Sequence, residues 1–98
     1  MPQEKTISTD ILRRYVGKYE VQTPQGPLLH KFTLVGDKLY LKIGDDLPIR
    51  IRPESETRFF RRMVDWSFEF DVESEGIVKG VNITPPGAPS PTYIRRIG

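Results

Sequence analysis

The chain has 98 residues, with 15 Lys and Arg against 13 Asp and Glu, which gives a formal net charge of +2. This length predicts one domain, and no apolar run approaches the roughly 18 residues of a membrane-spanning helix. The chain contains no cysteine, which excludes disulfides, thiolate metal sites and cysteine nucleophiles and leaves the redox compartment open. No apolar leader follows Met1, so we expect a soluble chain or a soluble piece of a longer one.

One short helix is predicted near the start of the chain. Ser8 is suited to cap a helix over Thr9–Val16, and Gly17 could end it in the left-handed conformation. One stripe of this helix is apolar and consists of Ile11, Leu12, Tyr15 and Val16. The helix should therefore lie on an apolar surface, which it needs because two turns are only marginally stable alone.

From Tyr19 onward the apolar period changes to two, which is typical of consecutive antiparallel strands joined by short turns. The predicted strands span residues 18–23, 28–35, 38–43, 48–52, 58–62, 66–72, 77–83 and 92–96, and the proline-rich stretch 84–91 is a loop. This pattern predicts an all-β fold, an antiparallel up-and-down barrel of about eight strands. We favour a barrel over a two-sheet sandwich because closure removes edge strands. The domain spans residues 8–98, and residues 1–7 are a tail or linker.

Alternation along the strands assigns the side chains of the inner face. These are Leu39, Leu41 and Ile43; Leu47, Ile49 and Ile51; and Trp66, Phe68, Phe70 and Val72. Three aromatic residues on one strand predict an interior filled by side chains rather than a ligand cavity.

Few residues are suited to catalysis. His30 is the one imidazole, and since no serine has a base at a recognisable spacing, we expect it to be a barrel-wall residue. The acidic groups at 45–46 and 69–75 lack metal-ligand spacing, and no phosphate-binding glycine motif occurs. We therefore expect no catalytic residue, no metal and no cofactor, and the chain itself is not expected to be an enzyme.

One basic stretch, residues 50–62, is similar in composition to the surfaces of nucleic-acid-binding barrels. Residues 50–62 carry five arginines and two glutamates, with Phe59, Phe60 and Trp66 in or near them. Residues 65–75, however, carry five acidic residues and no basic one. Adjacent strands should pair these opposite charges on their outer faces, so a mutually neutralised surface is the stronger interpretation.

Several motifs carry a resemblance to a known family. They are Leu12-x-x-Tyr15-Val16-Gly17-x-Tyr19-Glu20, Gly36-Asp37-x-Leu39-Tyr40-Leu41, Leu47-Pro48, Phe59-Phe60, Phe68-x-Phe70-Asp71 and Arg95-Arg96. Over Ser8–Ile97 the chain resembles the lipocalin-like domain of unknown function found C-terminal to beta-lactamase-type serine hydrolases, which include penicillin-binding-protein-like esterases and D-aminopeptidases. The resemblance implies a short helix leading into a barrel. The family's Ser-x-x-Lys and Tyr-x-Asn motifs belong to the preceding hydrolase domain and are absent here, so no catalytic residue is carried over. The loop 84–91 and the arginines of 58–62 depart from the usual pattern.

The resemblance favours a non-catalytic accessory domain that shapes active-site access or mediates protein contacts, with a hydrolase domain in cis or a protein partner in trans. One alternative is a barrel that binds a small apolar ligand near Trp66 and Phe68, and a second is a nucleic-acid-binding barrel. Across these hypotheses the candidate contact residues are Trp66, Phe68, Phe59, Arg58, Arg61 and Arg62. A location outside the cytoplasm would follow if the chain were part of a secreted hydrolase. The sequence itself indicates no cellular compartment.

Overall fold

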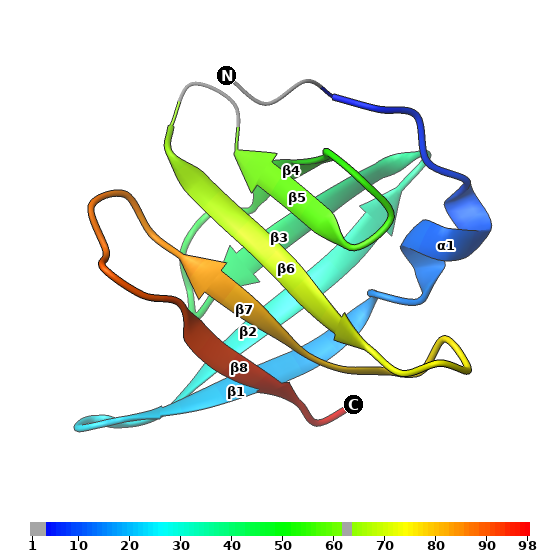
Figure 1. Ribbon diagram of the computed structural model, residues 1–98. Coiled ribbons are helices and arrows are strands. Elements are labelled where there is room, and N and C mark those ends of the chain that lie inside the picture. Colours follow the sequence, from blue (N-terminus) through cyan, green and yellow to red (C-terminus); the bar gives the residue numbers. More distant parts are fainter. Residues whose placement is uncertain (1–3, 62–63) are drawn as a thin grey trace.

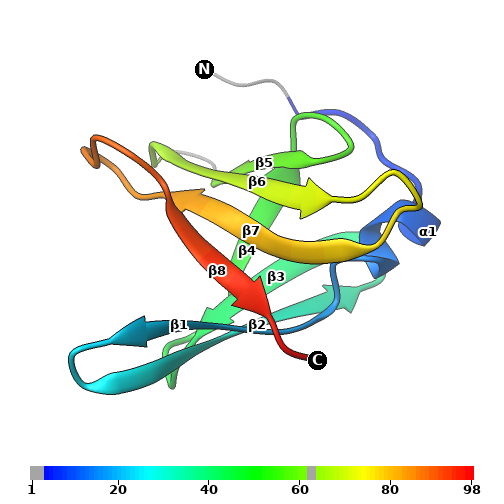
Figure 2. The same cartoon turned by 60° about the horizontal axis from the view of Figure 1, so that its bottom comes forward.

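Eight antiparallel strands close into a barrel in the computed structural model, which describes residues 4–61 and 64–98 (Figure 1). The elements are α1 Thr9–Arg13, β1 Gly17–Thr23, β2 Gly26–Val35, β3 Lys38–Ile43, β4 Ile49–Pro53, β5 Arg58–Arg61, β6 Trp66–Val72, β7 Val78–Thr84 and β8 Thr92–Arg96. The strand order follows the sequence, and β8 returns to pair with β1 through Tyr19↔Arg96 and Glu20↔Arg95 (Figure 2). The predicted all-β barrel is confirmed, with strand bounds within two residues. Arg62, the predicted end of the fifth strand, lies outside the described residues.

Aromatic side chains fill the barrel interior. Tyr19, Phe32, Phe59 and Phe68 are 0% exposed, and Phe70 is 3% exposed. The Phe70 ring lies 5.2 Å from Phe32 and 5.5 Å from Phe59, both in edge-to-face geometry, which adds to the stabilisation that burial of each ring provides. The predicted filled interior therefore agrees with the packing.

One inner-face prediction is wrong. Leu47 is 85% exposed, whereas Ile51 is buried and Ile49 is half-buried as predicted. The reason is that β4 begins only at Ile49, so Leu47 lies in the connection from β3. Alternation constrains a side chain only where the backbone is extended and paired, and a turn residue is free to point outward.

Helix α1 covers one end of the barrel (Figure 1). Leu12 and Tyr15 are 2% and 1% exposed, and the Tyr15 ring stacks on Phe70 with centroids 4.0 Å apart. The Tyr15 hydroxyl donates to the carbonyl oxygen of Glu56 in the β4–β5 turn. The opposite end, called the far end below, holds the β1–β2, β3–β4 and β7–β8 connections, the end of β5 and the start of β6. The described ranges 4–61 and 64–98 place no helix there.

The end of α1 corrects a second prediction. Ser8 caps the helix as expected, its Oγ accepting from the Asp10 N–H at 3.2 Å, but the helix ends at Arg13 and not at Val16. Gly17 is the first residue of β1 and does not cap the helix. Its φ is 152°, and a Cβ at this position would collide with the carbonyl oxygen of Gly98. Gly17 is needed for this close approach of the two chain segments.

Arg96 binds the segment that follows the helix. Its guanidinium donates to the carbonyl oxygens of Arg14 at 3.1 Å and Val16 at 3.0 Å, and it lies 5.9 Å from the centre of the Tyr19 ring. Tyr19 in turn donates its hydroxyl to the Tyr15 carbonyl at 3.0 Å. The chain leaves α1 through i→i+3 turns, in which Tyr15 N–H donates to Leu12 and Val16 N–H to Arg13. The carbonyls that then have no helical donor accept from side chains of β1 and β8 instead. The motif that joins helix to strand is thus a structural junction between both ends of the chain.

Candidate interaction surface

The predicted contact residues do not form one surface. Phe59 and Phe68 are 0% exposed and belong to the core, so they offer no area to a partner. Trp66 is half-buried at the far end, where it packs against the core with its ring 5.8 Å from that of Phe68. Arg61 stands opposite Trp66 in the register of β5 and β6. Arg62 lies outside the described residues.

Arg58 is held by acidic neighbours. Its guanidinium lies 3.5 Å from the Glu69 carboxylate across β5 and β6 and 3.7 Å from Glu54 in the preceding turn. The predicted cross-strand pairing of charges is therefore confirmed at this position. All three side chains are at least 36% exposed, so these pairs neutralise charge and contribute little to stability.

A second set of cations lies on the outer face of β1–β4 and was not predicted as a group. Lys18, Lys31 and Lys42 are exposed and stand directly opposite one another in register, Lys18↔Lys31 and Lys31↔Lys42. Like charges in directly opposed positions of a sheet repel. On β4, Arg50 is opposite Tyr40 of β3. This arrangement leaves a concentration of positive charge that an anion would relieve.

We define the cationic face as the outward strand positions of β1–β4. Its charged members are Lys18, Glu20, Lys31, Lys38, Lys42, Arg50 and Arg52. It thus holds six cations and one acid. The outer positions of the described parts of β5–β8 are more evenly mixed, since Arg58 is paired with Glu69, and Lys79 with Glu73 at 3.1 Å.

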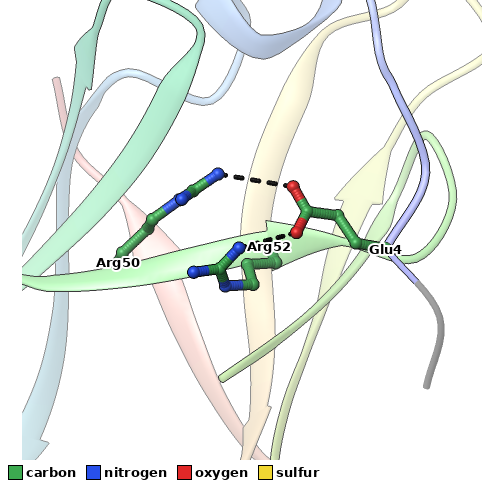
Figure 3. Close-up of polar contacts among 3 residues, drawn as sticks. All are labelled: Glu4, Arg50 and Arg52. Atoms are coloured by element: carbon green, nitrogen blue, oxygen red, sulfur yellow. Dashed lines mark hydrogen bonds and ion pairs between the residues drawn. The ribbon is translucent and has the colours of Figure 1, made fainter. Parts of the chain in front are cut away.

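One carboxylate from elsewhere in the chain is bound on this face. Glu4, in the segment before α1, reaches two arginines at once (Figure 3). Arg52 Nη1 lies 2.7 Å from Glu4 Oε1, and Arg50 Nη2 lies 3.3 Å from Glu4 Oε2. Each oxygen of the carboxylate therefore accepts from a different guanidinium, a geometry that recognises a planar anion with two acceptor atoms.

The surroundings of this pair suit a bound peptide. The Lys5 N–H donates to the carbonyl oxygen of Pro53 at 2.8 Å, so the segment is tied to the end of β4 by its backbone as well as by Glu4. The side chains of Arg50 and Arg52 are 28% and 20% exposed. Among the described residues, Nε of Arg50 is buried and has no hydrogen-bond acceptor. The pair thus has a donor left over after Glu4 is bound.

The prediction that acids of residues 65–75 neutralise Arg50 and Arg52 is wrong. Strand β4 pairs with β3 and β5, so β6 is not its neighbour, and the acid comes from the N-terminal segment. The lysine row did have a signal in the sequence. The two-residue turn at 36–37 fixes the hairpin register, which places Lys31 opposite Lys42.

The remaining candidate groups do not form a reactive site. His30 is 5% exposed on β2, and its Nδ1 is 3.4 Å from the Leu28 carbonyl oxygen. Burial lowers the pKa of His30, which favours the neutral imidazole. Over residues 4–61 and 64–98, no three His, Asp or Glu side chains are grouped to hold a metal ion. No helix of that part of the chain is both long and apolar enough to cross a membrane.

Together, the fold and the surface define a small β-barrel domain whose distinctive chemistry is on its outer face. The chain matches the family described as "Domain of unknown function (DUF3471)" over residues 1–95 and belongs to that family. It is also 38% identical over 68 residues to "Penicillin-binding protein 4*" of Bacillus subtilis (strain 168). That match covers 69% of this chain and 14% of the relative, so the chain spans only a small part of that protein. Both findings agree with the predicted relation to penicillin-binding-protein-like hydrolases, whereas the lipocalin-like character stays a prediction.

Proposed function

We propose that this chain is a non-catalytic accessory domain of a beta-lactamase-type serine hydrolase, which it contacts in cis or in trans and whose active-site access it shapes. The observation that carries the proposal is the 38% identity to a region of a penicillin-binding protein. The barrel supports it, because its interior is occupied by aromatic side chains and its one imidazole is buried in β2. Such a barrel is better suited to present a surface than to enclose a substrate.

The alternatives have less support. An apolar guest near Trp66 and Phe68 would compete with the aromatic side chains that already pack there. A nucleic-acid surface at β5 would need exposed aromatic rings for stacking, but Phe59 is 0% exposed and Phe60 is 5% exposed. Arg58, the expected phosphate-binding side chain, is held by two carboxylates instead.

The experiment uses the Bacillus subtilis relative in three forms. These are the natural protein, a form lacking the 68-residue matching region, and a form with this chain in place of that region. We measure the rate of labelling by a fluorescent penicillin and the thermal midpoint of each form. The deletion should lower one or both, and the replacement should restore it. Equal labelling rates and midpoints in all three forms would show that the region has no accessory role.

A further inference from the structure

The cationic face has a feature that the accessory role does not explain. Two of its arginines are arranged around a carboxylate, and the chain fills this position with its own Glu4. A residue only 3.3 and 2.7 Å from two guanidinium groups is a bound ligand in chemical terms, although it is covalently part of the chain. The site therefore shows which kind of anion this face accepts.

We propose that the cationic face binds an acidic polypeptide segment of the hydrolase domain, and that Glu4 occupies the Arg50–Arg52 site when this partner is absent. The identity of the partner rests on the proposed function, whereas the chemistry of the site rests on the contacts of Glu4. Acidic side chains of the partner would lie along the row formed by Lys18, Lys31 and Lys42. One of its carboxylates would replace Glu4.

The geometry favours a polypeptide over other anions. Two contacts hold the segment before α1: the ion pairs of the Glu4 carboxylate and the backbone hydrogen bond from Lys5 N–H to the Pro53 carbonyl. The site therefore already binds a peptide segment through a carboxylate and the main chain. Nucleic acid binding on a small barrel uses exposed aromatic rings, and the outward positions of β1–β4 contain one aromatic, the half-buried Tyr40. Leu29 and Val35, 40% and 63% exposed on the outer side of β2, add the apolar area that protein interfaces contain.

The energetics allow exchange. Glu4 is 39% exposed, so its contacts with the two arginines are partly screened by water and the cis carboxylate can be displaced. The opposed lysines repel one another, and an acidic partner removes this repulsion as it binds. Binding should therefore weaken as the salt concentration rises, because these charges are on the surface.

The test uses the 98-residue chain and a synthetic octaglutamate peptide as the probe. Binding is followed by titration of ¹⁵N-labelled protein at low salt and at 0.15 M. Arg52→Gln and Lys31→Gln should each weaken binding by about three- to fivefold, the size expected for loss of one exposed charge pair. The matched controls Arg58→Gln and Lys79→Gln remove the same charge from cations that are already paired elsewhere, and they should leave the affinity within about twofold.

A second comparison isolates the arginine site. Glu4→Gln and Glu20→Gln each raise the net charge by one on the same side of the barrel, but Glu4 alone occupies the Arg50–Arg52 site. Glu4→Gln should therefore strengthen peptide binding more than Glu20→Gln does, because it also removes a competitor. Equal effects of the two would overturn the assignment of the site. Arg52→Lys keeps the charge but not the geometry of the guanidinium, and its affinity for the peptide should lie between those of the parent and Arg52→Gln.

The remaining outcomes also decide the proposal. If all cation variants weaken binding equally, the attraction is general and the proposal is wrong. Single-stranded DNA or phosphatidylglycerol vesicles could bind more tightly than the peptide at equal charge. If Arg52→Gln and Lys31→Gln abolish that binding, the partner is not a polypeptide. Lys31 is exposed, so Lys31→Gln gives an answer even if Arg52→Gln does not fold. The hydrolase takes no part in this titration. Success here, with equal labelling rates and thermal midpoints in all three forms of the relative, would refute the proposed function and the identity of the partner and would leave the peptide-binding site standing.

Discussion

The two ends of the barrel are built by different means. At the α1 end, Tyr15 is 1% exposed, and Arg96 joins the helix to the last strand through two carbonyl oxygens 80 and 82 residues away in sequence. At the far end, Val21, Ile43 and Trp66 point inward but are only half-buried. The α1 end is therefore specified by contacts between distant segments, and the far end by local turns and partial burial.

This difference indicates what each end contributes. Removing a side chain from the α1 end should leave a cavity and unpaired carbonyl groups, both of which are costly in a chain of this size. Removing one from the far end lets water replace it at lower cost. Substitutions matched in type but placed at opposite ends therefore measure the contrast directly.

Tyr15→Ala should have the largest effect. It removes a buried ring that stacks on Phe70 at 4.0 Å and lies edge-on to Phe59 at 5.5 Å. We expect a loss of about 3–5 kcal/mol in the free energy of unfolding, measured by urea denaturation, which approaches the whole stability of a small domain. Tyr15→Phe is the control, since it keeps the ring and removes the hydroxyl that bonds to Glu56. A near-parental midpoint for Tyr15→Ala would show that the segment after α1 is not part of the core.

Arg96→Met should have the second largest effect. We expect it to lower the free energy of unfolding by about 2–3 kcal/mol, because the carbonyls of Arg14 and Val16 lose a charged donor. Arg95→Met is the matched control: Arg95 is the neighbouring arginine on β8, it is exposed, and its replacement should change stability by no more than about 0.5 kcal/mol. Urea denaturation of both variants gives the comparison. Equal losses would mean that Arg96 contributes only charge.

The sequence predicted the barrel well because its signals are local. Two-residue turns and alternation determine register and inward face, and they place eight strands within two residues of their observed bounds. It failed where distant segments decide the conformation. The carbonyls that follow α1 accept from Arg96, 82 and 80 residues away, and the partner of Arg50 and Arg52 is Glu4, 46 and 48 residues away. Period and composition carry no information about such pairs.

The candidate surface illustrates the same limit. Phe59 is a predicted contact residue because an aromatic residue among arginines resembles a stacking site, but alternation along β5 turns Phe59 inward and leaves Arg58 outside. The cationic face was missed because its members are spread over residues 18–52, and only the hairpin registers bring them together. Charge and hairpin register together locate the lysine row.

Trp66→Ala tests the far end. Trp66 contacts Phe68 but is half-buried, so we expect a loss of about 1–2 kcal/mol, below the 3–5 kcal/mol typical of a fully buried tryptophan. Urea denaturation, followed by circular dichroism because the substitution removes the one tryptophan, measures the change. A loss as large as that of Tyr15→Ala would contradict the contrast between the two ends and would place Trp66 in the core.

The smallest effect concerns His30, which faces inward in register with Tyr19 and Ile43. Burial lowers the pKa of His30 in the folded barrel, whereas the unfolded chain binds a proton at about the ordinary value of 6.5. The unfolded state therefore takes up more protons below this pH, and the stability that His30 contributes is lost as the pH falls from 7 to 5. Comparing urea midpoints of the parent and His30→Gln at pH 7 and pH 5 isolates this contribution, since other titrating groups are common to both. The parent should lose more stability than the variant over this interval. Identical losses would mean that the imidazole is hydrated in the folded state and that water enters the far end as deep as His30.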